Sequence, residues 1–176
     1  MGKDKRQSGA KQPIIPPGLV EPLAALQQLI ERFDNRGVII GGVAASLLGR
    51  ARLTVDLDAV ILLSTNDLDK LIDFAMNEGM TPRIVDAVAF ARKNRVLLLQ
   101  HELSGINIDI SLGILPFETE MVERAQKIMV GDIQVRLPTP EDLVIMKAVA
   151  HRPKDFEDIR AVAASHHDLD KKRIRY

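Results

Sequence analysis

The chain has 176 residues, of which 46% are hydrophobic, and its 24 Lys and Arg residues balance its 24 Asp and Glu residues. This length and composition predict one compact domain that buries about 70% of its surface, which excludes a disordered or fibrous protein. The absence of cysteine excludes disulfides, thiolate zinc sites and cysteine nucleophiles. The longest uncharged stretch, residues 37–49, is too short for a membrane span. We therefore expect a soluble, cytoplasmic protein with no membrane partner.

Positive charge gathers at the two ends of the chain. The basic residues of residues 1–12 and 168–176 are Lys3, Lys5, Arg6, Lys11, Lys171, Lys172, Arg173 and Arg175. The body between them is net acidic, so a polyanionic substrate would need metal ions or local basic residues to bind. The basic ends are typical of solvated tails, with nucleic-acid-binding arms as the alternative.

The first half of the chain alternates helical and strand patterns. Residues 1–17 are polar and then proline-rich, which predicts a flexible lead-in. An amphipathic helix follows over residues 19–33, and residues 38–40 form a strand that stops at Gly41-Gly42. The further elements predicted here are a helix over residues 43–48, a strand central in the sheet over residues 56–63 and a helix over residues 66–78 capped by Gly79.

The second half predicts two hairpins and a group of helices. The hairpins pair residues 95–101 with 106–112 and residues 128–130 with 133–137. Thr139 and Pro140 have the chemistry of a helix start, and Pro153 separates that helix from the next. The predicted helices cover residues 139–150, 155–164 and, briefly, 168–176. We expect an N-terminal tail (1–17), an α/β (α+β) core (18–138) and a C-terminal helical subdomain (139–176).

Three aspartates fall on predicted strands. Asp56 and Asp58 are one residue apart, so on a strand they point to the same face, about 7 Å apart at the backbone. In residues 106–112 the isoleucines occupy one face, which places Asp109 on the other. Three carboxylates on one sheet face suit Mg²⁺, and two such ions can stabilise a phosphoryl transfer. The alternatives are solvated acids at a strand end and a polar residue on an edge strand.

Two other features add to this pattern. Gly41-Gly42 joins a strand to a helix, where backbone amides can receive a phosphate; the alternative is a tight turn alone. Lys147 lies in an apolar helix stripe, where its side chain either supplies a cation to a bound anion or snorkels to the surface. Asp155 and Asp158 either position Lys147 or Arg152, or stabilise a helix N-terminus, and we expect both effects.

The full pattern consists of Gly41-Gly42, thirteen further residues, Asp56-Leu57-Asp58 and a later Asp109. It resembles the active site of the DNA polymerase beta-like nucleotidyltransferase superfamily. Within that superfamily, the Arg52, Thr54, Asp56 and Asp58 spacing is similar to the Arg-x-Thr-x-Asp-x-Asp motif of the small bacterial AbiEii-like (abortive-infection type) nucleotidyltransferases. A second similarity to that group is its helical Lys...Lys-Asp-x-x-Asp segment, represented here by Lys147, Lys154-Asp155 and Asp158. One departure is Gly42, where many members have serine.

This resemblance implies a nucleotidyltransferase-type mixed β-sheet flanked by helices, with a C-terminal helical segment. It also implies transfer of a nucleoside monophosphate from an NTP such as ATP to a hydroxyl group, with release of pyrophosphate. The implied metal ligands, for two Mg²⁺ or Mn²⁺ ions, are Asp56, Asp58 and Asp109, of which Asp109 also takes the proton of the hydroxyl. The implied nucleotide-binding residues are Gly41, Gly42, Arg52, Thr54, Lys147, Asp155 and Asp158, with Lys147 also counted as catalytic.

The sequence leaves open which molecule accepts the nucleoside monophosphate. The resemblance allows an RNA such as tRNA, a protein or a small molecule such as an antibiotic, and it allows a toxin–antitoxin or phage-defence component with a cognate partner. A different hypothesis is a nucleotide-binding regulatory or antitoxin-like module without turnover. A third is a structural interaction domain with solvated acids. The complete set of three acids favours the enzyme.

Overall fold

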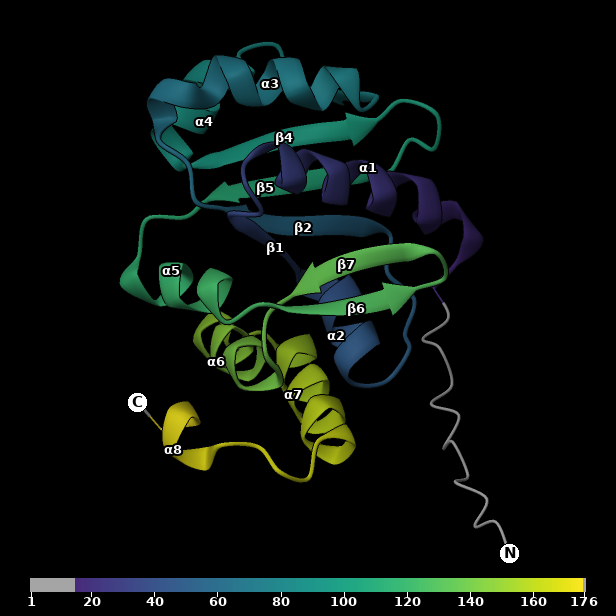
Figure 1. The fold of residues 1–176 in the computed structure, drawn as a ribbon, viewed down its shortest axis with the longest axis vertical. Helices are drawn as coiled ribbons and strands as arrows, with labels where there is room; N and C mark the ends of the chain where they lie inside the picture. The colour runs from purple at the N-terminus through teal and green to yellow at the C-terminus, as the bar shows by residue number, and fades with distance from the viewer. Residues whose placement is uncertain (1–14, 176) are drawn as a thin grey trace, which may run out of the picture.

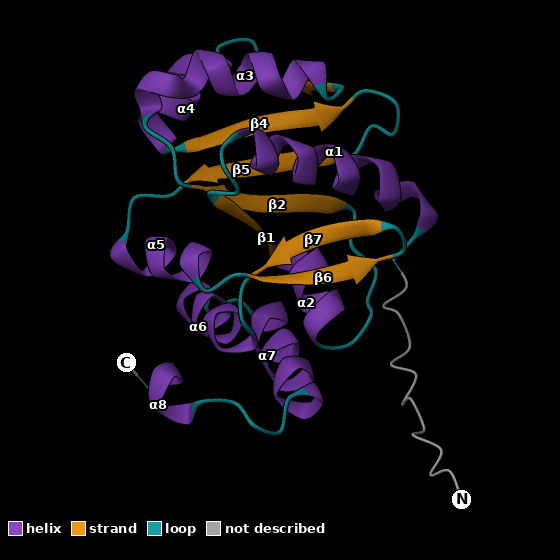
Figure 2. Cartoon of the chain, in the orientation of Figure 1, coloured by secondary structure: helices purple, strands orange, loops and turns teal. Residues whose placement is uncertain are grey.

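The computed structural model describes residues 15–175, which form a five-stranded mixed sheet flanked by helices (Figures 1 and 2). Most of the predicted N-terminal lead-in, residues 1–14, lies outside the described residues. Ile15, near the end of that lead-in, is buried in the main core, and a short 3₁₀ helix, Pro17–Leu19, leads from it into the first α-helix. The α/β fold class predicted from the sequence is confirmed.

The first helix, the strand after it and the next helix occur close to their predicted positions. Helix α1 (Val20–Arg32) buries its apolar stripe, and strand β1 (Gly37–Ile40) runs directly into helix α2 (Gly41–Leu48). The glycines belong to α2 rather than to a turn before it. Gly41 has a φ of +68°, a backbone conformation that glycine adopts far more readily than other residues, and it allows the chain to turn from strand to helix in one step.

The other strands of the sheet are β2 (Asp56–Ile61), β3 (Met80–Pro82), β4 (Val96–His101) and β5 (Asn107–Leu112), in the order β1-β2-β5-β4-β3. The β2 and β5 strands are parallel, and every other neighbouring pair is antiparallel, including the predicted β4–β5 hairpin. Strand β2 is paired along both edges, but β5 is the central strand. The two strands that carry the three acids are therefore neighbours.

Period-two alternation gives the sheet two different faces. On one face Leu57, Leu99 and Ile110 are fully buried in the main core, which helices α1, α3 (Leu68–Asn77) and α4 (Ala87–Asn94) help to close. On the other face Val38 and Val60 pack against helix α5 (Pro116–Glu123). The acids continue this second face toward the start of β2.

The C-terminal part of the chain lies against the region where β2 and α2 begin. Strands β6 (Gln126–Val130) and β7 (Ile133–Leu137) form the second predicted hairpin, and β7 lies beside β1 and α1. Thr139 caps helix α6 (Pro140–Ala150), as the sequence predicts, by accepting a hydrogen bond from the backbone N–H of Asp142. Helix α7 (Pro153–Ser165) packs on α6 and α2, and the short helix α8 (Lys171–Ile174) contacts α6 (Figure 1).

Three regular elements have no counterpart in the sequence prediction: β3, α4 and α5. Strand β3 has three residues and α4 and α5 have eight each, so none of them carries a long periodic pattern.

Within residues 15–175, no helix combines the length and the apolar character needed to cross a bilayer.

Candidate active site

Strands β2 and β5 bring the three predicted acids to one sheet face. Asp58 is the register partner of Asp109, and Asp56 is the partner of Asn107. Since alternate residues of a strand share a face, all three carboxylates lie on the same side, as the alternation predicts. Asp56 is exposed, whereas Asp58 and Asp109 are half-buried. We call these three side chains the sheet acids.

The glycines of α2 make room for the sheet acids and their neighbours. A side chain at Gly41 would overlap the Asp58 carboxylate, and a Cβ at Gly42 would lie 2.7 Å from Thr54 Oγ1. The Thr54 hydroxyl in turn donates to Asp56, with Oδ1 and the backbone oxygen each 3.3 Å away. Residues that are far apart in the sequence motif are therefore in direct contact at the start of α2.

The sheet acids are short of positive charge. Burial raises the pKa of Asp58, and the negative charges of Asp56 and Asp109 raise it further, against a smaller lowering by Lys147 and Lys154. Burial also raises the pKa of Asp109, and this effect outweighs the neighbouring Arg83 guanidinium. Like charges held together favour binding of a cation, and carboxylate oxygens are the ligands that Mg²⁺ prefers.

The carboxylates do not converge on one point as they stand. Arg83 donates from Nη2 to Asp109 Oδ1 at 2.6 Å, and Asp56 is held by Thr54. Across the described part of the chain, no group of three or more His, Asp or Glu side chains is close enough together to hold a metal ion. The oxygen ligands fit a divalent cation, and one of the three acids, Asp109, is engaged by Arg83.

A second group of aspartates lies on helix α7, opposite the sheet. The Lys147 ammonium from α6 is 2.7 Å from Asp158 and 3.2 Å from Asp155. Arg52 binds Asp158 with two nitrogens, at 2.8 and 3.2 Å, and Arg152 binds Asp155. Three cations thus share two buried carboxylates, which we call the helix acids. No buried side-chain nitrogen or oxygen among residues 15–175 lacks a hydrogen-bond partner.

The sequence left two roles open for this group. The snorkelling alternative for Lys147 is wrong, because its side chain is 6% exposed and ends on the helix acids. Asp155 has both of the effects expected of it, since it also accepts a hydrogen bond from the backbone N–H of Arg152 at the start of α7. Burial alone would raise the pKa of Asp155, but hydrogen bonds from Arg152 and Lys147 outweigh it and lower the pKa to about 2.

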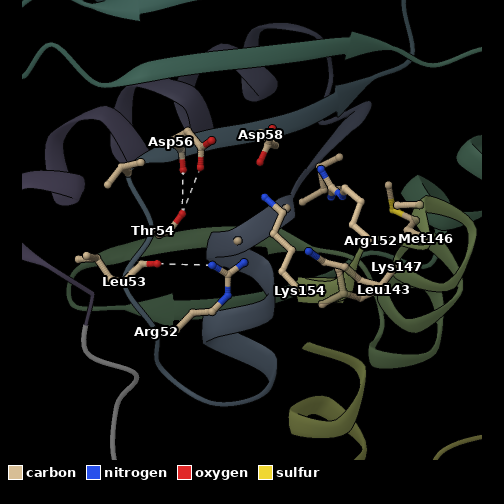
Figure 3. A pocket seen from close by; sticks show the side chains of 15 residues that line it. Arg52, Leu53, Thr54, Asp56, Asp58, Leu143, Met146, Lys147, Arg152 and Lys154 are labelled. Carbon is tan, nitrogen blue, oxygen red and sulfur yellow. Dashed lines mark hydrogen bonds between the residues drawn. The ribbon is translucent and has the colours of Figure 1, made fainter. Parts of the chain in front are cut away.

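A cavity of about 300 Å³ lies between the acids of β2 and the cations of α6 and α7 (Figure 3). Asp56 and Asp58 lie on one side of it, and Lys147, Arg152 and Lys154 lie on the other. The predicted site residues that line it are Gly41, Gly42, Arg52, Thr54, Asp56, Asp58 and Lys147. Three predicted residues do not line it: Asp109 lies on the next strand, and Asp155 and Asp158 lie behind the cations that they hold.

Some residues of this cavity were not assigned a site role from the sequence. Lys154 is exposed in the first turn of α7, and its charge reaches Asp58 across the cavity. Its place beside Asp155 in the Lys-Asp-x-x-Asp segment was the available signal. Leu53 and Val55 line the rim and are 79% and 68% exposed. No signal in the sequence marks these two apolar residues as part of a cavity.

The fold and this cavity define the class of protein. It has a nucleotidyltransferase-type mixed sheet, with acids beside the point where strand β1 passes through Gly41 into helix α2. The chain belongs to a family described as nucleotidyltransferases of unknown function (DUF6036), whose sequence profile matches residues 19–175. Among curated protein sequences, none matches this chain.

Solved structures of nucleotidyltransferases have a similar fold. The lincomycin-bound lincosamide antibiotic adenylyltransferase LnuA is 15% identical with a TM-score of 0.57, over 87% of this chain and 99% of that one. ANT(2″)-Ia in complex with adenylyl-2″-tobramycin is 15% identical with a TM-score of 0.54, over 86% and 89% of the two chains. An antigenic nucleotidyltransferase-like protein from Paracoccidioides brasiliensis is also 15% identical, with a TM-score of 0.55 over 82% and 74%. At these identities the similarity is one of fold.

Proposed function

We propose that this protein is a metal-dependent nucleotidyltransferase that moves a nucleoside monophosphate from an NTP to a hydroxyl group and releases pyrophosphate. One observation carries the proposal: Asp56 and Asp58, on one face of β2, lie opposite a group of cations across a cavity of about 300 Å³. Negative and positive groups in this arrangement suit a substrate that has a metal-bound triphosphate at one end.

Asp56, Asp58 and Asp109 are the proposed metal ligands. Mg²⁺, with Mn²⁺ as a substitute, would offset charge on the phosphate oxygens and favour loss of the proton from the attacking hydroxyl. Thr54 orients Asp56 through its hydroxyl, and Gly41 leaves the space that the Asp58 carboxylate occupies. Asp109 lies on the neighbouring strand, and we assign it the proton of the acceptor hydroxyl.

The opposite side of the cavity is the proposed site of the β and γ phosphates. The backbone amides of Gly41 and Gly42 begin α2, where partial positive charge favours an anion. Arg52 and Lys147 contribute charge from fixed positions, because Asp158 holds both of them. Lys154 and Arg152 complete this side. In this assignment Asp155 and Asp158 position the cations and do not contact the nucleotide.

The acceptor class is proposed from two sources. The adenylyltransferases of similar fold are described with lincomycin and with adenylyl-tobramycin, which favours ATP as donor and a small hydroxyl compound as acceptor. The Arg52 to Asp58 motif favours the AbiEii-like group, and with it an RNA acceptor and a toxin–antitoxin role with a cognate partner. Both acceptor classes require the same donor site.

A nucleotide-binding module without turnover is the second candidate function. The ion pair between Arg83 and Asp109 favours it, because this pair engages the acid that would take the proton. Under this hypothesis the NTP binds beside Asp56 and Asp58, and no label is transferred.

The test is a transfer assay with α-³²P-labelled ATP, GTP, CTP and UTP in Mg²⁺, against lincomycin, tobramycin and total tRNA. The enzyme hypothesis predicts a labelled product with one donor, which is lost in Asp58→Asn and kept in Asp132→Asn, a control in the exposed β6–β7 turn. Nucleotide binding without label transfer to any acceptor class would favour the module.

A further inference from the structure

Arg83 lies outside the cavity, yet it contacts one of the sheet acids. Its backbone N–H donates to the carbonyl of Leu98 at 3.1 Å, so the residue extends the pairing of β3 with β4. Leu98 is the register partner of Asp109 on β5. The main chain of Arg83 is thus held by the sheet itself, and strand β4 lies between it and Asp109. This position directs its guanidinium to the third acid.

The contact is short and only partly screened by solvent. Arg83 Nη2 lies 2.6 Å from Asp109 Oδ1, and the two side chains are 26% and 37% exposed. Charge-assisted hydrogen bonds of this length are among the stronger ones in proteins. Because Asp109 is half-buried, its ionised form needs a partner, and Arg83 is the partner that the fold supplies.

A guanidinium and a divalent cation compete for the same carboxylate oxygens. Within residues 15–175 the other two sheet acids have no arginine partner, and their neighbours on this face are the Thr54 hydroxyl and Gly41. Asp58 and Asp109 are register partners on one sheet face, so the carboxylate that Arg83 engages belongs to the residue directly beside Asp58 on the next strand.

We propose that Arg83 is a positioning residue that competes with the divalent metal for Asp109, and so sets the metal affinity of the site. With the ion pair intact, Asp56 and Asp58 are the ligands that a metal meets first. Asp109 joins them when its contact with Arg83 is broken. This inference rests on the proposed function, because it takes Asp109 to be a metal ligand.

A purely structural role for Arg83 makes a different prediction. If the ion pair only ties the β3 to α4 segment to the sheet, its loss lowers the unfolding temperature and leaves metal binding unchanged. Competition predicts that metal binds more tightly when the arginine charge is removed. Metal affinity is therefore the readout that separates the two roles.

The experiment titrates the full chain with Mn²⁺ alone, with free Mn²⁺ measured by electron paramagnetic resonance and folding checked by circular dichroism. We expect Arg83→Gln to lower the dissociation constant of Mn²⁺ about threefold to fivefold, the range expected for loss of a partly exposed ion pair. Arg83→Lys, which keeps a charge but not the planar guanidinium, is expected to lower it about twofold. The control Arg32→Gln removes a similar 2.7 Å ion pair, to Glu78, which joins the ends of α1 and α3 and includes none of the sheet acids, so it should leave the constant unchanged.

The Asp109→Asn background completes the design. In that background Arg83→Gln should have no effect on Mn²⁺ binding, because the contested carboxylate is gone. An unchanged or weaker affinity in folded Arg83→Gln and Arg83→Lys, with wild-type binding intact, would overturn the competition and leave the proposed function standing. Absence of Mn²⁺ binding by the wild-type chain would overturn both.

Discussion

The sheet acids and the helix acids are the same type of residue in opposite surroundings. Asp58 lies beside two other carboxylates, and burial and their negative charge raise its pKa. The Asp155 side chain has no exposed surface, yet hydrogen bonds from Arg152 and Lys147 lower its pKa to about 2. The number of cations within hydrogen-bond distance accounts for the difference. In the described part of the chain the helix acids have three such cations, and the sheet acids have Arg83 alone.

This contrast separates two functions of a carboxylate. The helix acids are already neutralised by the protein, so they hold Arg52, Lys147 and Arg152 in fixed positions beside the cavity. Among the sheet acids only Asp109 has a cation partner, Arg83, so the further positive charge that the group needs has to come from outside the chain. A site that is to bind a metal-bound NTP needs both properties on opposite sides, because the substrate itself carries a cation and an excess of negative charge.

The largest expected effect comes from breaking the helix acids. Asp158→Ala leaves the Lys147 ammonium with one buried carboxylate and removes both carboxylate oxygens that Arg52 binds. It should therefore lower the free energy of unfolding by about 3–5 kcal/mol. Denaturant unfolding measures this value. Asp132→Ala, in the exposed turn between β6 and β7, is the control and should stay within about 0.5 kcal/mol of wild type. A loss below about 1 kcal/mol for Asp158→Ala would contradict the network.

The matching change among the sheet acids should lower activity and leave stability intact. Asp58→Asn keeps the shape of the side chain, removes a proposed metal ligand and should lower nucleotide transfer at least about 100-fold, since even residues behind metal ligands affect activity 10–100-fold. In metal-free buffer the same variant should be no less stable than wild type, because burial and the neighbouring acids disfavour the charge that it removes more than Lys147 and Lys154 favour it. Transfer assays and denaturant unfolding measure the two effects. Marked destabilisation would mean that Asp58 is a structural residue.

The pH dependence of stability should distinguish Asp155 from an ordinary carboxylate. Its pKa is about 2 in the folded state against 3.8 without these partners. The ionised form therefore stabilises the fold by about 2 kcal/mol above pH 3.8, and this contribution is lost as the pH falls toward 2. We expect the difference in unfolding free energy between wild type and Asp155→Asn to shrink between pH 5 and pH 2. A constant difference over that range would contradict the assignment.

The smallest expected effect sharpens the contrast between two lysines of the cavity. Lys154 is exposed, so Lys154→Gln should weaken NTP binding about tenfold, the equivalent of about 1.4 kcal/mol, and leave the unfolding free energy unchanged. Lys147 is buried between the helix acids, so Lys147→Gln should lower stability as well as affinity. Calorimetry and denaturant unfolding on the same two variants measure the difference. Equal stability losses would remove the distinction.

The strands and turns around the site could be predicted from local chemistry. Period-two alternation is enough to place Asp56, Asp58 and Asp109 on one face, and Thr139 with Pro140 is enough to start α6. These signals are local, because they depend on residues within a few positions of each other. The β3 strand, with three residues and a proline, is too short to give such a signal.

The partners of the charged side chains could not be predicted in the same way. Arg52 and Asp158 are 106 positions apart, and Arg83 and Asp109 are 26 apart. Their contacts depend on how α7 packs against the turn before β2 and on how β3 joins the sheet. The sequence places an acid on a strand or a helix, but the packing of distant elements decides whether a cation neutralises it.

The central claim is that the sheet acids bind a metal-bound nucleotide, and calorimetry tests it most directly. ATP, GTP, CTP and UTP are each titrated in Mg²⁺ into the wild-type chain and into Asp56→Ala, with Asp132→Ala as the control. The account predicts that at least one nucleotide binds to the wild-type chain and to the control, and that binding is lost in Asp56→Ala. Binding of the same strength to Asp56→Ala, or no binding to the wild-type chain, would contradict it.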